Sequence, residues 1–464
     1  MTFMKGFVRR VHFVGIGGVG MSGIAQVLLN LGFEVSGSDL KETEVTLRLA
    51  RGGARIFLGH KASAVGKAQV VVVSSAVSPS NPEVAASRRL GIPVVARAEM
   101  LAELARLKKT VTVSGSHGKT TTTSMVAMAL SAAGADPTMI IGGQLANIGS
   151  NARLGTGEYL VAEADESDGS FLRLLPLVAV VTNIDSDHLD FYGDMEKLKA
   201  AFLEHLHRLP FYGAAVLCAD DPVLRGLIGK VQRPIITYGL GPAEWSAEVS
   251  ESGSEGLLGG VRLRVRHRGK SAGAFRLRVP GRHNASNALA AVAVGAYLGL
   301  DLKRVFQGLE EFRGVGRRLE RLGEAGGVAF IDDYGHHPTE IRATLKALLS
   351  AAPGRRIVAR FQPHRFSRTQ LLHREFGPAL KAASKVFVME VYPAGEAPIP
   401  GVDSGLIVKS ARKAGVDAHP FSRAVDLVRE LRKGDIVLTL GAGDVWKVGL
   451  DLLRRLESSL LSSV

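Results

Sequence analysis

The sequence predicts an α/β protein built from parallel, doubly wound sheets and divided into several domains. Its 464 residues are more than one ordinary hydrophobic core accommodates. A strand, a glycine-rich turn and a helical pattern follow one another three times, beginning at Val11, Val111 and Ile436. Strands that alternate with helices are typical of parallel sheets. Hydrophobic residues make up 46% of the chain and charged residues 22%, a composition that folds around cores.

Composition also narrows the class of protein. A single cysteine, Cys218, excludes a disulfide framework and a cysteine-rich metal centre. Glycines from Gly15 onward interrupt the apolar run behind the basic N-terminus, and no apolar segment reaches the roughly 18 to 20 residues that span a bilayer. We therefore expect a cytoplasmic protein without membrane insertion. The net charge of +14 is spread along the chain without a basic tract, so we expect anionic small molecules and no nucleic acid as partners.

The first domain is expected over residues 1–108. It opens with the run Gly15–Gly20, a G-x-G-x-x-G pattern directly after a strand, and Asp39 closes the next strand at about the expected distance. Backbone amides of such a loop bind a pyrophosphate, and the acid binds a ribose hydroxyl. The alternative is a turn that only packs a helix onto the sheet. The motif predicts a pyrophosphate ligand but does not identify it as NAD.

The second domain, expected over residues 109–314, carries a different phosphate loop. Residues Gly115–Thr121 form a shortened G-x-x-x-x-G-K-[ST] motif after the strand 111–113. Its amides would cradle phosphates, Lys119 would reach the β- and γ-oxygens, and the Thr120 hydroxyl would bind Mg²⁺. The alternative is an ordinary turn with a chance lysine. Two phosphate-binding loops in one chain argue against a simple dehydrogenase.

Acidic residues follow two strands of this domain. They lie in residues 162–168 and 183–190, and a strand that ends in a carboxylate beside a phosphate loop is the Walker-B arrangement for Mg²⁺. Solvated loop acids are the alternative.

The apolar alternation within residues 246–279 predicts an antiparallel hairpin attached to this domain. Asn287 could either contact a base or cap a helix.

The third domain is expected over residues 315–464. Two strands end in polar and basic side chains, in residues 332–338 and 362–369, at the edge where α/β sites form. Arginines at 313–318 lie at the domain junction, where they are either ligand contacts or surface charge. The third glycine run, residues 441–444, is at least as consistent with a structural turn as with a ligand contact.

Together these motifs resemble the Mur ligase family of peptidoglycan synthesis. The resemblance lies in GIGGVGMSGIA, SGSHGKTTTT, EADESDGSF, NIDSDHLDFYGD, GRHNASNALAA, GVGRRLE, DDYGHHPTEI, FQPHRFSRT and GAGDVW, and it covers essentially the whole chain. It implies a Rossmann-like N-terminal domain for a UDP-sugar and a central P-loop ATPase-like domain whose parallel sheet carries small antiparallel strands. A Rossmann-like C-terminal domain would bind an amino acid. A family member that recycles a tripeptide shares many of these motifs.

The resemblance also implies roles for individual residues. The UDP-sugar positions are Gly15, Gly17, Gly18, Gly20, Ser38, Asp39 and Ser75. The ATP positions are Gly115, Ser116, His117, Gly118, Lys119, Thr120, Thr121, Asn287, Arg317 and Asp332. The amino-acid positions are Tyr334, His364, Arg365 and Arg368, and the Mg²⁺ positions are Thr120, Glu163 and His188. Lys119, Glu163, His188 and His364 would be catalytic.

The implied reaction is amide formation driven by ATP. The lactyl carboxylate of UDP-N-acetylmuramate attacks the γ-phosphate, and the amine of L-alanine then attacks the resulting acyl phosphate. The expected protein is a monomer or homodimer that uses ATP and Mg²⁺. One departure from the family pattern is Phe202, which matches the position where ligases that add later residues have a lysine. A nicotinamide-dependent oxidoreductase and a non-catalytic nucleotide switch are the alternative functions.

Overall fold

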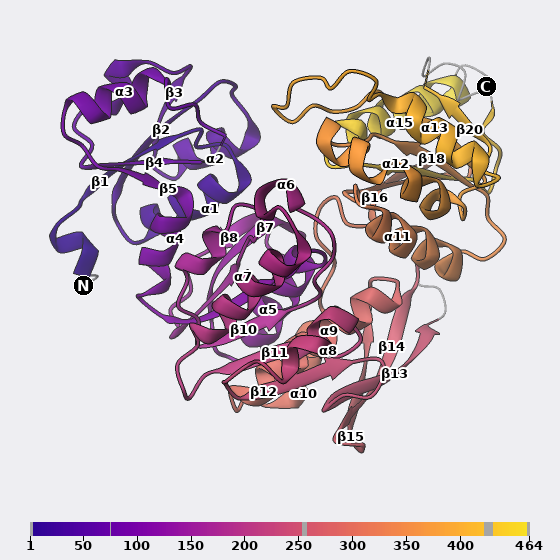
Figure 1. Ribbon diagram of the computed structural model, residues 1–464, viewed down its shortest axis with the longest axis horizontal. Coiled ribbons are helices and arrows are strands. Elements are labelled where there is room, and N and C mark those ends of the chain that lie inside the picture. Colours follow the sequence, from indigo (N-terminus) through magenta and orange to yellow (C-terminus); the bar gives the residue numbers. More distant parts are fainter. Residues whose placement is uncertain (1–2, 75, 253–257, 422–429, 462–464) are drawn as a thin grey trace. The chain divides into compact units, whose positions relative to one another are not determined.

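Three β-sheets follow one another along the chain in the computed structural model (Figure 1). The structure describes residues 3–74, 76–252, 258–421 and 430–461. The chain divides into two compact units, of which the second contains the third sheet together with residues 249–263 and 276–285. Within the described residues, no helix combines the length and the apolar character required to cross a membrane.

The N-terminal sheet has five parallel strands in the order β3-β2-β1-β4-β5. Its elements are η1 (Phe3–Gly6), β1 (Arg10–Val14), α1 (Val19–Asn30), β2 (Glu34–Asp39), α2 (Glu44–Arg51), β3 (Arg55–Leu58), η2 (Ala62–Val65), β4 (Val70–Val73), α3 (Pro82–Arg89), β5 (Val94–Ala96) and α4 (Arg97–Ala105). The strand order reverses between β1 and β4. Open α/β sheets bind ligands in the crevice at such a switch point, and the predicted glycine loop follows β1 there.

The second sheet has ten strands in the order β15-β14-β13-β12-β11-β10-β6-β9-β7-β8. Its strands are β6 (Lys109–Ser114), β7 (Thr138–Leu145), β8 (Ser150–Arg153), β9 (Tyr159–Glu163), β10 (Val178–Val181), β11 (Ala214–Cys218), β12 (Ile235–Gly239), β13 (Trp245–Ser252), β14 (Gly260–His267) and β15 (Lys270–Leu277). Its helices are α5 (Lys119–Ala132), η3 (Ser170–Arg173), α6 (Leu189–Tyr192), α7 (Met195–His207), α8 (Pro222–Ile228), α9 (Arg282–Tyr297) and α10 (Leu302–Glu310). Strand β6 pairs in parallel with β9 and β10, so the phosphate loop leaves from the interior of the sheet.

The predicted hairpin is formed by β14 and β15. Arg268 and Gly269 connect them with φ of 47° and 78°, the pair of positive values that a two-residue type I′ turn requires. The hairpin continues the ten-stranded sheet through β13, which pairs in parallel with β12, so it is part of the main sheet and not a separate appendage.

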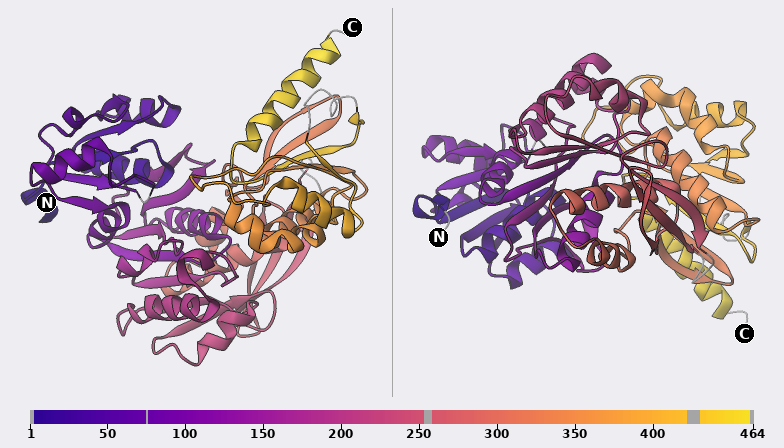
Figure 2. Two further views of the ribbon diagram at one scale, coloured as in Figure 1. Left: turned by 45° about the horizontal axis from the view of Figure 1, so that its top comes forward. Right: turned by 90° about the horizontal axis from the view of Figure 1, so that it is seen from below.

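The third sheet has six strands in the order β16-β17-β21-β18-β19-β20, parallel except for β16. Its elements are β16 (Glu320–Ala325), β17 (Val328–Asp333), α11 (Pro338–Ala351), β18 (Ile357–Phe361), α12 (Phe366–Leu380), β19 (Lys385–Val388), α13 (Ser404–Lys413), β20 (Ala418–Pro420), β21 (Ile436–Leu440) and α15 (Val445–Leu461). Alternate residues of β18 join two cores: Phe361 packs with residues of α11, α12 and α13, and Val358 with Leu452 of α15. Figure 2 shows α15 extending beyond this sheet.

Candidate active site

The phosphate loop, residues Gly115–Thr121, connects β6 to α5. Gly118 has a left-handed conformation (φ 80°) at the start of α5, and as the N-cap residue it has no side chain to cap the first-turn amides of that helix. Gly115 has φ of 126°, and a Cβ there would overlap the Thr182 hydroxyl. Uncapped amides at a helix N-terminus bind anions through their N–H groups and the helix dipole. The backbone of the loop is therefore suited to phosphate.

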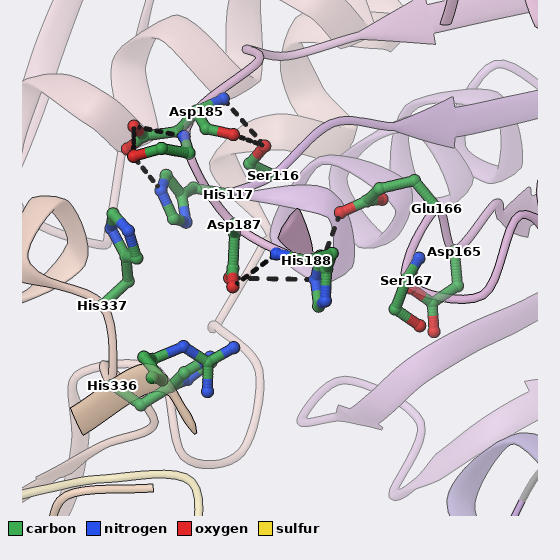
Figure 3. Close-up of polar contacts among 12 residues, drawn as sticks. Ser116, His117, Asp165, Glu166, Ser167, Asp185, Asp187, His188, His336 and His337 are labelled. Atoms are coloured by element: carbon green, nitrogen blue, oxygen red, sulfur yellow. Dashed lines mark hydrogen bonds and ion pairs between the residues drawn. The ribbon is translucent and has the colours of Figure 1, made fainter. Parts of the chain in front are cut away.

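Residues that follow β10 hold the phosphate loop in place. The amide of His117 donates to Asn183 Oδ1 at 2.8 Å, and the Thr182 hydroxyl donates to the His117 carbonyl at 2.6 Å. The His117 ring lies 2.9 Å from the Asp185 carboxylate, and the amide of Asp185 donates to the Ser116 hydroxyl (Figure 3). These contacts fix the loop before any ligand binds, which lowers the entropy cost of binding.

Lys119 is the first residue of α5 and lies among acidic side chains. Its ammonium donates to the Gly115 carbonyl at 2.8 Å and to Glu166 Oε1 at 2.8 Å. Burial lowers the pKa of Lys119, but the negative charges of Glu166, Asp165 and Glu163 outweigh it and raise that pKa, so the lysine is a cation. Burial raises the pKa of Glu166 to about 7, against the pull of Lys119. The structure thus brings Lys119 and the acids of residues 163–166 together.

His188 lies near the same carboxylate oxygen of Glu166 as Lys119 does. Its Nε2 is 3.7 Å from Glu166 Oε1 and 3.7 Å from Asp187 Oδ2 (Figure 3). Glu163, at the end of β9, accepts from the Gly142 amide at 2.9 Å. Thr120 is buried on the first turn of α5. Carboxylate and hydroxyl oxygens with one imidazole form a donor set that suits a hard divalent cation such as Mg²⁺.

Phe202, on α7, has no side-chain atom that could coordinate a metal ion. Phe202 is fully buried and packs edge-on against Phe171, with ring centroids 5.3 Å apart. An apolar ring offers no donor to a cation, so any cation in this site depends on other side chains.

Asn287 lies beside the phosphate loop. It is buried and sits inside α9, the sixth residue of that helix, so the helix-cap interpretation is wrong. A Cβ on Gly118 would lie 3.0 Å from Asn287 Oδ1. The amide of Asn287 is therefore close to where a nucleotide phosphate would enter.

In the glycine loop of the N-terminal sheet, several backbone amides are hydrogen-bonded to other groups of the same sheet. The amides of Gly15 and Ile16 donate to the Ser38 carbonyl, and the Gly17 amide donates to the Asp39 carboxylate at 2.9 Å. The N-cap residue of α1 is Gly18, which has no side chain to cap the first-turn amides, so these amides are suited to a ligand. The Asp39 carboxylate therefore stabilises the conformation of the glycine loop.

Two serines were predicted to bind the UDP-sugar. The Ser38 hydroxyl is buried and donates to Glu83 at 2.9 Å. Ser75 lies outside the described residues. Both assignments remain predictions.

The predicted C-terminal residues gather at the carboxyl ends of β17, β18 and β21. Arg317 donates to Asp332 at 3.0 Å and to the carbonyls of Gly441 and Gly443. The third glycine run therefore positions an arginine through its backbone. Burial raises the pKa of Asp332, and Arg317 opposes that shift.

Aromatic and basic side chains line the same edge. The guanidinium of Arg317 lies 5.1 Å from the centre of the Tyr334 ring, within cation–π range. Arg368 is buried on the first turns of α12, with Nη1 3.3 Å from the His364 carbonyl. His364 stacks on Tyr392, with ring centroids 5.6 Å apart. A buried guanidinium beside the His364 imidazole is suited to a small carboxylate ligand.

Several residues that organise the site were not identified from the sequence. Asp333 accepts from the amides of Leu319 and Gly335 and shapes the turn that carries Tyr334. Glu396 accepts from the amide and hydroxyl of Ser367 beside Arg365. Asp333 lies in a strand-end motif, which was a usable signal. Glu396 follows no motif, and only the fold brings it to α12.

Comparison with known proteins gives matches along most of the chain. The family model "Mur ligase family, catalytic domain" matches residues 10–109, "Mur ligase middle domain" matches 113–295, and "Mur ligase, glutamate ligase domain" matches 317–443. A curated UDP-N-acetylmuramate–L-alanine ligase of Desulfatibacillum aliphaticivorans is 51% identical over 448 residues, covering 96% of this chain and 98% of that protein.

Solved structures are also similar to this protein over nearly the whole chain. The crystal structure of a UDP-N-acetylmuramate–alanine ligase from Thermotoga maritima has a TM-score of 0.82 and 32% identity, covering 97% of this chain and 99% of that one. A murein peptide ligase from Psychrobacter arcticus has a TM-score of 0.71 and 24% identity, with coverage of 97% and 99%. The second similarity shows a shared fold alone.

Proposed function

The chain belongs to the Mur ligase family, and from that premise we propose that it joins L-alanine to UDP-N-acetylmuramate at the expense of ATP. It has the three-domain α/β fold of that family. The observation that carries the assignment is 51% identity over 96% of the chain to a UDP-N-acetylmuramate–L-alanine ligase.

The first chemical step transfers the γ-phosphoryl group. The lactyl carboxylate attacks the γ-phosphorus, ADP leaves, and an acyl phosphate forms. Two anions must approach each other for this attack, so positive charge has to be present beforehand. The amides of Gly118 and the following residues, together with the ammonium of Lys119, supply that charge.

The second step forms the amide. The amine of L-alanine, once deprotonated, attacks the acyl carbon, and inorganic phosphate leaves. Tyr334, His364, Arg365 and Arg368 form the pocket for the amino acid, with Arg368 as the partner of its carboxylate. Binding by these side chains would orient the amine toward the carbonyl carbon and so reduce the entropy cost of the attack.

Mg²⁺ fits the residues beside the phosphate loop. Glu166 Oε2 is buried without a hydrogen-bond partner among the described residues, so this donor set has unused coordinating capacity. Thr120, Glu163 and His188 would hold the ion, which supplies charge neutralisation for phosphoryl transfer when bound. Glu163→Ala should therefore abolish phosphate release, while its thermal melting stays within a few degrees of the wild type. Full turnover of this variant at ordinary Mg²⁺ would remove Glu163 from the metal site.

The direct test is phosphate release from ATP in the presence of UDP-N-acetylmuramate, with the amino acid varied. We expect release with L-alanine, together with formation of the alanyl product detected by mass spectrometry. Release with a tripeptide but not with L-alanine would assign the recycling reaction instead.

ATP and a UDP-sugar are cytoplasmic metabolites, so we place the reaction in the cytoplasm. We propose that a monomer or a homodimer catalyses it. Light scattering during size-exclusion chromatography distinguishes these two states.

The two alternative functions make different predictions in the same assay. A nicotinamide-dependent oxidoreductase would release no phosphate, and a nucleotide switch would hydrolyse ATP without forming an amide. Neither alternative accounts for the family matches to all three regions of the chain.

A further inference from the structure

We infer that Glu166 is a divalent-cation ligand of the ATP site, and that the Lys119 ammonium occupies the place of the cation while no nucleotide is bound. Lys119 and the cation would then alternate at one carboxylate. The inference rests on the proposed function, because the nucleotide is what draws Lys119 away from Glu166 and brings the cation.

The first observation is the incomplete coordination of Glu166. Its side chain is 0% exposed, and Oε1 accepts from Lys119 at 2.8 Å. Oε2 is equally buried and has no hydrogen-bond partner in the described part of the chain. Buried polar atoms in native proteins are almost always paired, so an orphaned carboxylate oxygen in an ATP site indicates a missing ligand.

The second observation is the balance of charge. One ammonium, that of Lys119, faces the carboxylates of Glu163, Asp165 and Glu166. Arg97 and His188 act on Asp165 as well, whereas Lys119 is the cation that acts on Glu166. A divalent cation with hard oxygen ligands would compensate these carboxylates better than one ammonium.

The third observation is the position of Lys119. Its ammonium lies between the Gly115 carbonyl and Glu166, folded back onto its own loop. To bind a phosphate that enters at the α5 N-terminus, the ammonium must leave this place. Glu166 would then lose its counter-ion, and it would have to take up a proton or bind another cation in place of the lysine.

The fourth observation is the neighbouring imidazole. His188 Nε2 is 3.7 Å from Glu166 Oε1. Two donors that share one Mg²⁺ at about 2.1 Å in octahedral geometry lie about 3 Å apart, so a small rotation of either side chain allows both to ligate one ion. Tyr192 donates to the Glu166 carbonyl at 2.6 Å and fixes the backbone of this residue.

The experiment measures Mn²⁺ binding without nucleotide, by the electron paramagnetic resonance signal of the free ion. Lys119→Gln should bind one Mn²⁺ per chain at least about tenfold more tightly than the wild type, because the competing ammonium is gone. The double variant Lys119→Gln/Glu166→Gln should lose that gain. A matched control, Lys119→Gln/Asp168→Asn, removes an acid of the same loop and should keep the gain.

A second arm covers the case that Lys119→Gln does not fold. With saturating ADP, Glu166→Gln should bind Mn²⁺ about tenfold more weakly than the wild type, whereas ADP affinity measured without metal should not fall. The inference is overturned if Lys119→Gln gains no Mn²⁺ affinity, or if the double variant keeps the gain. Such a result would leave the ligase assignment intact wherever wild-type protein still releases phosphate with L-alanine.

Discussion

Three residues that were predicted to lie in the site have a positive φ, a conformation that residues other than glycine rarely adopt. His188, Arg317 and Arg365 have φ of 58°, 61° and 70°. A non-glycine residue in such a conformation costs about 1–3 kcal/mol and persists only where the surrounding structure imposes it. Each of the three lies in a connection between two elements. The backbone strain therefore occurs at residues whose side chains are predicted to act in the site.

Arg368 provides a test at the residue scale. Its buried guanidinium is the expected partner of the alanine carboxylate, and loss of such a charge-assisted pair costs roughly 2 to 4 kcal/mol. Arg368→Ala should therefore raise KM for L-alanine by about 30-fold or more and change KM for ATP by much less. Steady-state kinetics in both substrates give the comparison.

The matched control is Arg374→Ala. Arg374 lies on the same helix, α12, but is exposed, so its loss should leave both KM values near those of the wild type. Equal rises in the two KM values for Arg368→Ala would place this arginine outside the amino-acid pocket.

At the scale of elements, the phosphate loop depends on a glycine that no other residue can replace. Gly115 has φ of 126°, and a Cβ there would overlap the Thr182 hydroxyl and lie 2.9 Å from the Asn183 carbonyl. Gly115→Ala should lower the melting temperature and weaken ADP binding by about tenfold or more, as measured by differential scanning and titration calorimetry.

Gly226 gives the opposite expectation. It lies within α8, and a Cβ there would meet nothing within 4 Å. Alanine has the higher helix propensity, so Gly226→Ala should stabilise the protein by about 0.5–1 kcal/mol and leave ADP binding unchanged. A destabilised Gly226→Ala, or a Gly115→Ala that melts like the wild type, would contradict this account of the loop.

Helix α7 carries a buried histidine that makes stability depend on pH. His205 stacks on Phe171, and burial lowers its pKa to about 4, below the ordinary 6.5. The folded chain therefore keeps His205 neutral while the unfolded chain takes up a proton below pH 6.5. Stability falls as pH falls from about 6.5 to 4, by up to ~1.4 kcal/mol per pH unit, and this group has no effect above that window.

The variant His205→Phe keeps an aromatic ring against Phe171 and removes the titration. Urea unfolding at pH 7.5 and pH 5 should show that the wild type loses about 2 kcal/mol more stability than the variant between these two values. Equal losses would mean that His205 takes up its proton in the folded protein.

Elements were predictable where the local pattern was complete. The apolar run 357–361 predicts a strand, and β18 has these bounds, because the run is buried on both faces and bounded by polar turns. The apolar run 386–391 also predicts a strand, but β19 ends at Val388. The amide of Met389 still donates to the carbonyl of Phe361, the last residue of β18, and beyond it Tyr392 bonds to Pro363 in the loop that follows β18. The turn between β6 and α5 was predictable because its glycines and lysine directly follow an apolar strand.

The supporting contacts of the site were not predictable from local patterns. Asn183 is 68 residues away from Gly115 in the sequence but holds the His117 amide, and Tyr392 stacks on His364 from another strand end. Glu166 was visible only as one acid in a cluster. Its full burial and its pairing with Lys119 depend on how β9 and β6 lie side by side in the sheet.

At the scale of the whole molecule, the two phosphate-binding loops belong to different sheets. Residues Gly15–Gly20 follow β1 of the N-terminal sheet, and Lys119 follows β6 of the ten-stranded sheet. Each loop is braced by its own neighbours, Asp39 in the first and Asn183 in the second. A change in one loop should therefore leave ligand binding at the other intact.

Lys119→Ala tests this independence together with the function. Without the ammonium, charge that builds up on the transferred phosphoryl group is not neutralised, and removal of such a preorganised contact typically slows a reaction by about 10² to 10³. Phosphate release with L-alanine should fall by at least that factor, while the Kd for UDP-N-acetylmuramate by titration calorimetry should stay within about twofold of the wild type, because its glycine loop is untouched. If the variant keeps its rate, Lys119 is not the phosphate-loop lysine of a ligase. If the wild-type protein binds NAD and not the UDP-sugar, the glycine loop serves a dinucleotide and the ligase assignment fails.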